Sequence, residues 1–378
     1  MPRRSSNCRS SLSATANPPP PSSRKGRSRS ATNPSPLHEV RSSSRAAQGI
    51  HDGPRRQFFL HAPRTAHHAA RVNVLRTAAE LGAAPRRVCL AIGVFDGVHL
   101  GHQQVIRQTV ADARQHEALA VVVTFDRHPN AVLAPERTPP LLYSLPQKLR
   151  VIGSLGVDAT LLIRFDKAFS EQTGEAFVRS LAGGFGHIHG VCVGASFTFG
   201  HQRSGTVASL RELGRELGFQ VHGLAAVSLD GEVVSSTRIR DAIRAGDLDG
   251  ASQMLGRVWS LSGGVVSGAR FGRKLGFPTA NLDTAGLLLP PNGVYAARAT
   301  AGGRAHRAVV NIGVRPTVAP AAAAQVEAHL LDFDADLYGQ ELEITFIEKL
   351  RDERKFPSLD ALKTQIAADI SAARALFG

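Results

Sequence analysis

The stretch VCLAIGVFDGVHLGHQQVI, residues 88–106, decides the fold of this 378-residue chain. It begins as a short apolar run of β-forming residues, passes through a glycine-containing turn and continues with helical spacing. Four further β-type runs follow, at 120–125, 159–165, 189–194 and 219–227. Helical patterns separate the runs, at 102–118, 175–184 and 204–217, and two short ones close the series at 237–246 and 248–256. Strands that alternate with helices predict an α/β fold with a doubly wound parallel sheet.

The pattern changes after Trp259. Five β-type runs joined by turns with glycine and proline occupy 261–268, 293–301, 306–313, 326–333 and 342–350. They predict a small antiparallel β-barrel. The chain closes with an amphipathic helical pattern at 357–377, for which Ser358 is the expected N-cap. We therefore predict two folded domains, 86–257 and 258–378, after an extension at 1–85.

The positive charge of the chain is concentrated in this extension. The whole chain has 45 Lys and Arg against 31 Asp and Glu, a net charge of +14. Residues 1–87 contain 16 of the basic and three of the acidic residues, which leaves a net charge of +1 for the rest. The Ser/Pro/Arg-rich composition predicts disorder. A basic arm for RNA is one interpretation, but aromatic residues are not interleaved with the charges at 18–36, so we favour a dispensable extension without a nucleic-acid partner.

Methionine and cysteine usage bear on the start and the location of the protein. No methionine lies between Met1 and Met254, so we expect residues 1–70 to reflect an upstream ATG assignment, with a GTG start near Val72 or Val74. A transit peptide with an organelle location is the alternative. The three cysteines are far apart and show no metal-ligand spacing, and no apolar run is long enough to span a membrane. We therefore predict a cytoplasmic protein without a membrane partner.

A first candidate site lies in the turn after the first strand. His99 and His102 flank Gly101, and both imidazoles can face a bound triphosphate and stabilise charge on the α-phosphoryl group during in-line attack. The turn falls at the strand end where open α/β sheets bind ligands, and its glycines let backbone N–H groups approach phosphates. A polar turn without chemistry is the alternative for these four residues alone.

A second element, SSTRIR at 235–240, supports the interpretation of the turn as a nucleotide site. Its hydroxyls can cap a helix, and Arg238 and Arg240 suit phosphate oxygens. Capping alone for Ser235 and Ser236, and solvent exposure for the two arginines, are the alternatives. The combination with HxGH favours a nucleotide site.

Four elements in order, GVFDGVHLGH, TFDRHP, VGASFTFGHQRSG and SSTRIR, resemble the FAD synthetase module of bacterial bifunctional riboflavin kinase/FAD synthetases. The resemblance implies adenylyl transfer from ATP to FMN, which gives FAD and pyrophosphate, with His99 and His102 as catalytic residues. The ATP-site residues it implies are Gly93, Phe95, Asp96, Gly101, Ser235, Ser236, Thr237, Arg238 and Arg240. Asp96 could orient the turn or have a buried cap-like role. The residues implied on the flavin side are Ser196, Phe199, Gly200 and Arg203.

The chain departs from the family pattern at three places. Ser196 stands where the family usually has Asp or Asn, and a shorter uncharged hydroxyl weakens the expected contact. Arg127 replaces a usual Pro in TFDRHP, and YSLPQK at 143–148 replaces a more charged stretch. None of these changes removes a residue with an implied role in the chemistry.

A second candidate site lies in VVSGARFGRKLGFPTANL, residues 265–282. Thr279 and Asn281 are two residues apart and share a face if the segment is extended. A hydroxyl and an amide oxygen suit Mg²⁺, a hard cation. The preceding glycines form a flexible flap that can approach phosphates, and a simple glycine-rich hairpin is the alternative. The flap residues with candidate phosphate contacts are Gly268, Gly272, Gly276, Arg273 and Lys274.

From alternation alone, Glu327 would lie on an exposed polar strand face. However, LGFPTANL, GVYA, NIGVRPT, VEAHLLDFDADLYG and KLRDERKF resemble the riboflavin kinase domain of the same family. The resemblance implies that Glu327 is the general base for the ribityl 5′-hydroxyl, with Mg²⁺ bound at Thr279 and Asn281. It places ATP at Gly268, Gly272 and Lys274, and it gives Asn311 and Arg315 a supporting role in the loop.

The predicted protein is therefore a nucleotidyltransferase domain followed by a barrel kinase domain, with riboflavin, FMN and ATP as substrates and Mg²⁺ as cofactor. Three alternatives remain, of which an FMN adenylyltransferase with a flavin-binding kinase-like domain is disfavoured by the intact PTAN and Glu327. A cytidylyltransferase of the HxGH superfamily is disfavoured by the flavin-side element, and a basic RNA-binding protein by the charge distribution. A homo-oligomer is compatible with the sequence.

Overall fold

The computed structural model describes residues 73–81, 87–268, 271–314 and 324–378, all within one compact unit of the chain. Its first part is a six-stranded sheet in the order β1-β4-β3-β2-β5-β8, and every neighbouring pair is parallel. The strands are β1 (Asn73–Leu75), β2 (Val88–Ile92), β3 (Leu119–Phe125), β4 (Ala159–Ile163), β5 (Ile188–Gly194) and β8 (Gln220–Leu224).

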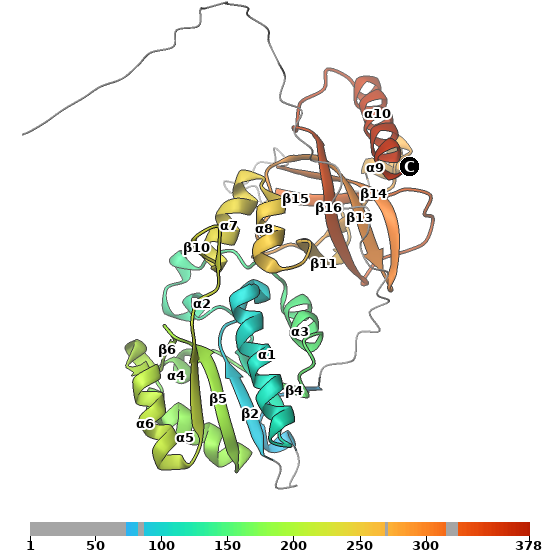
Figure 1. Cartoon of the computed structure of the whole chain (residues 1–378). Coiled ribbons are helices and arrows are strands. Elements are labelled where there is room, and N and C mark those ends of the chain that lie inside the picture. The colour runs from blue at the N-terminus through green and yellow to red at the C-terminus, as the bar shows by residue number, and fades with distance from the viewer. Residues whose placement is uncertain (1–72, 82–86, 269–270, 315–323) are drawn as a thin grey trace, which may run out of the picture. The chain divides into compact units, whose positions relative to one another are not determined.

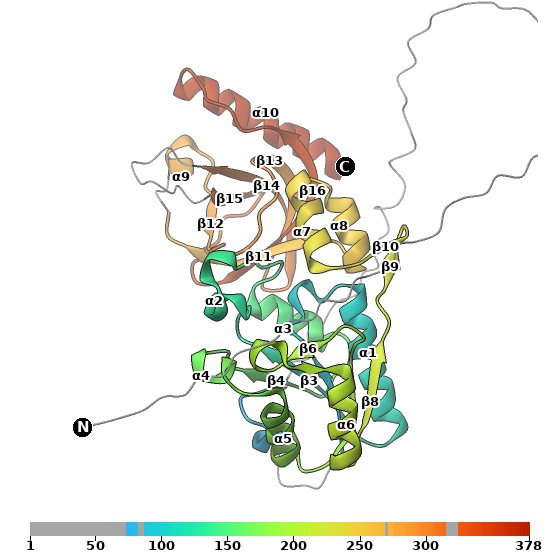
Figure 2. The same cartoon turned by 90° about the vertical axis from the view of Figure 1, so that its left-hand side faces the viewer.

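Helices cover both faces of this sheet (Figures 1 and 2). The main ones are α1 (Leu100–Gln115), α5 (Gly174–Phe185) and α6 (Val207–Leu217). Strand β2 is buried along its whole length because its side chains alternate between two cores. Val88, Leu90 and Ile92 pack with α5 and α6, whereas Cys89 and Ala91 pack with α1. The predicted doubly wound sheet is confirmed.

The second part is a closed barrel in the order β11-β12-β15-β14-β13-β16, with antiparallel pairing throughout. Its strands are β11 (Ser260–Val266), β12 (Ala280–Leu282), β13 (Gly293–Ala301), β14 (Arg304–Val314), β15 (Ala324–Leu330) and β16 (Glu341–Arg351). The C-terminal helix α10 (Leu359–Phe377) packs on the barrel through Ala373. The Ser358 hydroxyl accepts a hydrogen bond from the backbone N–H of Ala361 at 3.2 Å, so the predicted N-cap is confirmed.

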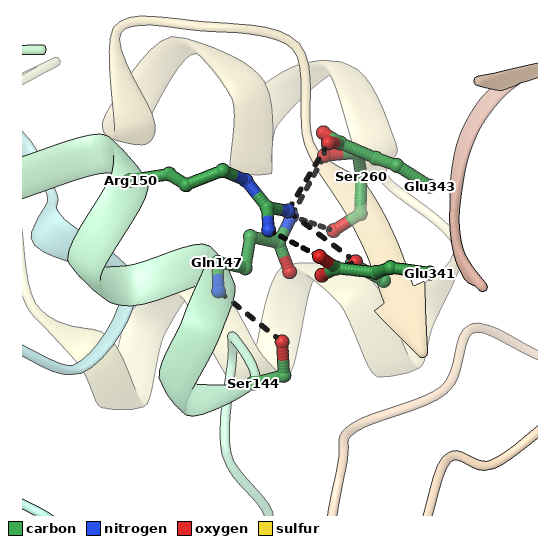
Figure 3. A network of polar contacts seen from close by, with 7 residues as sticks. Ser144, Gln147, Arg150, Ser260, Glu341 and Glu343 are labelled. Carbon is green, nitrogen blue, oxygen red and sulfur yellow. Dashed lines mark hydrogen bonds and ion pairs between the residues drawn. The ribbon is translucent and has the colours of Figure 1, made fainter. Parts of the chain in front are cut away.

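Three helices contact the barrel from the side of the sheet. Helices α7 (Ser236–Ala245) and α8 (Leu248–Leu255) share an apolar core with the barrel strands. Helix α3 (Leu145–Gly153) reaches strands β11 and β16 with polar side chains, as Figure 3 shows. Gln147 donates to the Ser260 carbonyl and hydroxyl, at 3.1 and 2.9 Å, and Arg150 forms an ion pair with Glu341. The Ser144 hydroxyl caps α3, which fixes the start of this bridging helix.

Several small elements were not predicted. They are α2 (Asn130–Leu133), α4 (Lys167–Ser170), α9 (Phe271–Leu275), β6 (Thr198–Phe199), β7 (Gly205–Thr206), β9 (Ser228–Leu229) and β10 (Glu232–Val233). Strand β1 lies inside the extension predicted to be disordered, and it is ordered by pairing with β4. Residues 1–72 and 82–85 of the predicted extension lie outside the described residues. No helix in the described ranges is long and apolar enough to cross a membrane.

Candidate functional site

The turn between β2 and α1 has an unusual backbone. Phe95, Gly97 and Val98 have positive φ angles of 52°, 76° and 43°. Glycine adopts this left-handed region freely, whereas a β-branched residue such as Val98 is a genuine outlier there. Backbone strain of this kind persists only where the surroundings impose it, and it clusters at functional sites. The turn that carries the two predicted histidines is therefore held in shape by its neighbours.

His99 and His102 lie together at the start of α1. Their rings are stacked with centroids 3.6 Å apart, and the His102 ring meets Phe95 edge-on at 5.3 Å. Burial, with a smaller effect of the Arg257 charge, lowers the pKa of His99 to about 4, and burial lowers the pKa of His102 well below its usual range. Both imidazoles are neutral near pH 7. Each Nδ1 is buried without a hydrogen-bond partner in the described structure, so no described protein group occupies either atom.

The two glycines of this turn with predicted roles lie against aromatic rings. A Cβ on Gly93 would lie 3.0 Å from the Phe95 ring, and one on Gly101 would lie 3.2 Å from the His99 ring. These distances are tighter than ordinary side-chain contacts, so a larger residue at either position would displace a ring of the site.

Asp96 joins three segments beneath the turn. Its carboxylate accepts hydrogen bonds from the backbone N–H of Leu142, at 3.1 Å, and from the Arg240 guanidinium. Its backbone carbonyl accepts one from the Ser236 hydroxyl at 3.0 Å. Arg240 also donates to the Pro140 carbonyl at 2.8 Å, and both members of the ion pair are buried. Asp96 therefore orients the turn, and protein groups hold the Arg240 guanidinium.

Two other residues of SSTRIR bind protein groups: Ser235 caps a helix and Arg238 contacts a hairpin. The Ser235 hydroxyl accepts a hydrogen bond from the backbone N–H of Arg238 at 3.2 Å and caps α7. The Arg238 guanidinium donates to the carbonyls of Leu229 and Glu232, and it pairs with the Glu232 carboxylate at 3.2 Å. The prediction put this guanidinium on a phosphate. The structure instead puts it on the β9–β10 hairpin, because acceptors there satisfy it.

A hollow of about 360 Å³ opens beside His102. The residues that line it are Val94, Asp96, His102, His128, Asn130, Arg137, Pro139, Ser236, Thr237 and Arg240. A larger pocket of about 690 Å³ shares Val94, His128 and Asn130 with the hollow. The two spaces are therefore neighbours, and molecules bound in each can meet at these shared residues.

Aromatic side chains dominate the larger pocket. Six phenylalanine rings follow one another with centroids 5.3–6.4 Å apart, namely Phe125, Phe165, Phe169, Phe177, Phe199 and Phe197. Phe199, Gly200 and Arg203, which were predicted to contact flavin, line this pocket. Ser196 is exposed and lines a different hollow beside α6. An apolar aromatic pocket suits a flat ring system such as a flavin.

Lys148 of α3 is a site residue that the sequence prediction missed. Its ammonium group is buried and donates to the carbonyls of Val94 and Phe125, at 3.3 and 2.8 Å, and to the Thr124 hydroxyl at 3.3 Å. These acceptors lie where β2 and β3 end, next to the hollow. Burial lowers the pKa of Lys148 from 10.5 to about 8. The motif YSLPQK contained this lysine, but the motif alone does not show that it points inward.

The burial of Lys148 predicts a specific pH dependence of stability. Because the pKa is about 8 in the folded state and near 10.5 when unfolded, the unfolded chain binds more protons between these values. Stability due to this group therefore rises with pH across that window. Relative to Lys148→Met, the unfolding free energy of the parent should increase by about 3 kcal/mol, at 1.36 kcal/mol per pKa unit. Denaturant titrations of both proteins at pH 7.5 to 10.5 measure the difference, and a constant difference would contradict the buried charge.

In the barrel, oxygen-bearing side chains lie abreast on three neighbouring strands. Asn281 of β12 pairs with Glu327 of β15, and Glu327 pairs with Asn311 of β14. Directly paired residues of antiparallel strands point to the same face of the sheet. Val326 and Ala328 are buried in the barrel core, so the three polar side chains face outward.

That outward face is the wall of a cavity of about 360 Å³. Thr279, Asn311 and Glu327 line it, as do residues of α9 and α10. The alternation in sequence correctly puts Glu327 on a polar strand face, but the two helices turn that face into a cavity wall. Asp369 of α10, which the sequence prediction missed, binds Arg351 at 2.8 Å on the same wall.

The glycine flap approaches the two predicted metal ligands closely. A Cβ on Gly268 would lie 2.4 Å from the Asn281 amide, and one on Gly272 would lie 3.1 Å from the Thr279 hydroxyl oxygen. Only a residue without a side chain fits at either place. Lys274 is exposed and does not line the cavity. Arg315 lies outside the described residues.

Two family models match the chain in succession. The FAD synthetase model matches residues 82–238, and the riboflavin kinase model matches residues 255–377. The first match contains the turn, the aromatic pocket and all the lining residues of the hollow except Arg240. The second contains the barrel and its cavity.

Known proteins resemble the chain over most of its length. The bifunctional riboflavin kinase/FMN adenylyltransferase of Pseudomonas fluorescens is 41% identical over 292 residues, which are 77% of this chain and 93% of the relative. The protein of the same name from Escherichia coli K12 is 37% identical over 309 residues, 81% of this chain and 98% of the relative. A solved structure described as a macrolide-efflux protein from Streptococcus pneumoniae has a TM-score of 0.67 at 28% identity, and the match covers 80% of this chain and 98% of that one.

Proposed function

This chain belongs to the family of bifunctional riboflavin kinase/FMN adenylyltransferases, and we propose that it divides the two reactions between the two sites described above. It phosphorylates riboflavin to FMN and transfers an adenylyl group from ATP to FMN, which gives FAD and pyrophosphate. Its substrates are riboflavin, FMN and ATP. The hollow at His102, whose ring stacks on that of His99, is assigned to adenylyl transfer, and the barrel cavity at Glu327 to phosphorylation.

The observation that carries the first assignment is the pair of stacked, neutral imidazoles with unpartnered Nδ1 atoms beside an aromatic pocket. FMN would place its ring system among the phenylalanines and ATP its triphosphate in the hollow. An oxygen of the FMN phosphate attacks the α-phosphorus of ATP, the bond from that phosphorus to the bridging oxygen breaks, and pyrophosphate leaves. N–H groups of His99 and His102 stabilise the charge on the α-phosphoryl oxygens. The start of α7, where Ser236 and Thr237 border the hollow, favours the β- and γ-phosphates.

In the barrel, Glu327 has the position of a general base. Its carboxylate takes the proton of the ribityl 5′-hydroxyl, the hydroxyl oxygen bonds to the γ-phosphorus of ATP, and ADP leaves. The apolar part of the cavity, formed by Leu275, Phe277 and Val309 among others, suits the flavin ring. Asn311 lies abreast of Glu327 and is suited to hold the hydroxyl.

Mg²⁺ fits the residues at the cavity edge. The Thr279 hydroxyl and the Asn281 amide supply hard oxygen donors, and Gly272 and Gly268 approach these two residues without a side chain of their own. The ion would supply charge compensation on the transferred phosphoryl group. Within the described ranges no group of three or more His, Cys, Asp or Glu residues could hold a metal ion, so these neutral ligands would depend on ATP to complete the coordination.

The Mg²⁺ assignment predicts the behaviour of Thr279→Val, which removes the hydroxyl and keeps the shape. The Mg²⁺ concentration for half-maximal FMN formation should rise on the order of tenfold, comparable with the loss of a metal-site partner. FAD formation from supplied FMN, assayed over the same Mg²⁺ range, controls for the demand of MgATP itself and should be unaffected. An unchanged Mg²⁺ dependence of the kinase reaction would show that Thr279 does not bind the metal ion.

A cytoplasmic location is part of the proposal. Cys89 and Cys192 are buried and free, and burial raises the pKa of these thiols to about 11 and about 12. Cysteines that form no disulfide are typical of a reducing compartment, which supports this location. The domain limits 86–257 and 258–378 are retained as part of the proposal, without a nucleic-acid partner.

A further inference from the structure

Arg257 connects the adenylyltransferase turn to the segment that leads into the barrel. It lies between α8 and β11, far in sequence from the turn. Its guanidinium donates to the backbone carbonyl of Gly97 and, at 3.0 Å, to those of Val98 and Leu255. Gly97 and Val98 are two of the residues with left-handed backbone. The Arg257 side chain thus forms hydrogen bonds directly with the strained part of the turn.

Gln103 of α1 makes a parallel connection. Its side-chain amide donates to the Val98 carbonyl at 2.9 Å and to the Leu255 carbonyl at 2.7 Å. Gln103 is buried and approaches the same two acceptors as Arg257. The carbonyl of the strained Val98 therefore accepts two bonds, and Leu255 ties both donors to the end of α8. The segment from Leu255 onward belongs to the match with the riboflavin kinase model, although the turn belongs to the other one.

Arg257 is also a half-buried cation whose charge Glu343 compensates only in part, from beyond ion-pair distance. Its guanidinium lies over the Tyr143 ring at 5.0 Å, and its Nε is buried without a hydrogen-bond partner. Within the described parts of the chain, Arg257 forms no ion pair. Burying a charge without an opposite charge is costly unless the protein or a ligand compensates it. An ATP triphosphate bound at the neighbouring histidines would supply negative charge.

We propose that Arg257 is a positioning residue of adenylyl transfer, which holds the strained turn in its ATP-binding conformation and places positive charge behind it. The side chain acts through the Gly97 and Val98 carbonyls and does not touch the reacting atoms. The inference rests on the proposed assignment of the turn as the ATP site of adenylyl transfer. It means that Leu255 and Arg257, which lie in the match with the riboflavin kinase model, support the active site at the turn of the first domain.

The test compares two variants of the full chain, Arg257→Met and Arg257→Lys. Methionine keeps an unbranched stem but removes the charge and the donors, whereas lysine keeps the charge and cannot span two carbonyls in the same way. In FMN adenylylation, Arg257→Met should lower kcat/KM for ATP by about 10²-fold, as misplacement of a catalytic turn by about 1 Å does. The KM for ATP should rise, and Arg257→Lys should recover part of the loss.

Riboflavin phosphorylation by the same molecules is the internal control, because it needs a folded chain and ATP but uses the other site. It should remain at the parent level in both variants. Arg215→Met, which removes an exposed arginine of α6, controls for the loss of one positive charge and should leave both reactions unchanged.

Two outcomes would overturn the inference. They are parental FAD formation by Arg257→Met and an equal loss of both reactions, and the second indicates a role in folding only. A lower kcat for FAD formation alone would mean that Arg257 positions the turn for the transition state. Failure of the underlying assignment is recognised separately, because His102→Ala would then also form FAD at the parent rate.

Discussion

Glu327→Gln is expected to abolish the formation of FMN from riboflavin while leaving adenylylation of supplied FMN at the parent rate. Glutamine keeps the size of the side chain and can still form hydrogen bonds, but it cannot accept the proton of the ribityl hydroxyl. A positioned general base contributes about 10²–10⁴-fold to a rate, so the loss should fall in that range. The measurement is the initial rate of FMN formation from riboflavin and ATP, with FAD formation from FMN followed in parallel.

Glu348→Gln is the matched control for this prediction. Glu348 is an exposed residue of β16, so the same chemical change there should leave both rates unaltered. If Glu327→Gln phosphorylated riboflavin at a rate close to that of Glu348→Gln, Glu327 would not be the base.

His102→Ala should leave an enzyme that converts riboflavin to FMN and stops there. The substitution removes the imidazole that borders the hollow proposed to hold the triphosphate, and the loss of one preorganised donor costs about 10²–10³-fold in rate. It also removes the ring that stacks on His99 and meets Phe95, so the KM for ATP is expected to rise as well. FAD formation from FMN and ATP at varied ATP concentration measures both effects.

His187→Ala serves as the comparison for His102→Ala, because His187 is exposed and lies before β5. Its rates should equal those of the parent. FAD formation by His102→Ala at that same level would mean that HxGH is a polar turn without chemistry.

Much of the fold could be predicted because the relevant signals are local. The run at 88–92 is apolar at every position, as a strand covered on both faces must be. Strand β1 carries no such signal, since three residues form it and its order comes from pairing with β4, more than 80 positions later. The β-propensity of the residues in β1 cannot reveal a pairing with so distant a strand.

The residues of the candidate sites could likewise be predicted only where the signal is local in the sequence. HxGH, SSTRIR and PTAN are short motifs with spacing that indicates their chemistry. Arg238 shows the limit of such motifs, because its guanidinium is taken up by carbonyls of a hairpin that the sequence did not reveal. Lys148 and Arg257 act through backbone carbonyls brought close only by tertiary packing, so neither stands out in the sequence.

If two separate sites of one chain carry out successive steps, two variants with different defective sites should complement each other. Glu327→Gln and His102→Ala are each incubated with riboflavin, ATP and Mg²⁺, alone and together, and the flavins are separated over time. We expect no FAD from either variant alone and steady FAD formation from the mixture, because FMN released by His102→Ala is a substrate for Glu327→Gln. Comparable FAD formation by a single variant, or none from the mixture when each retains its other reaction, would contradict it.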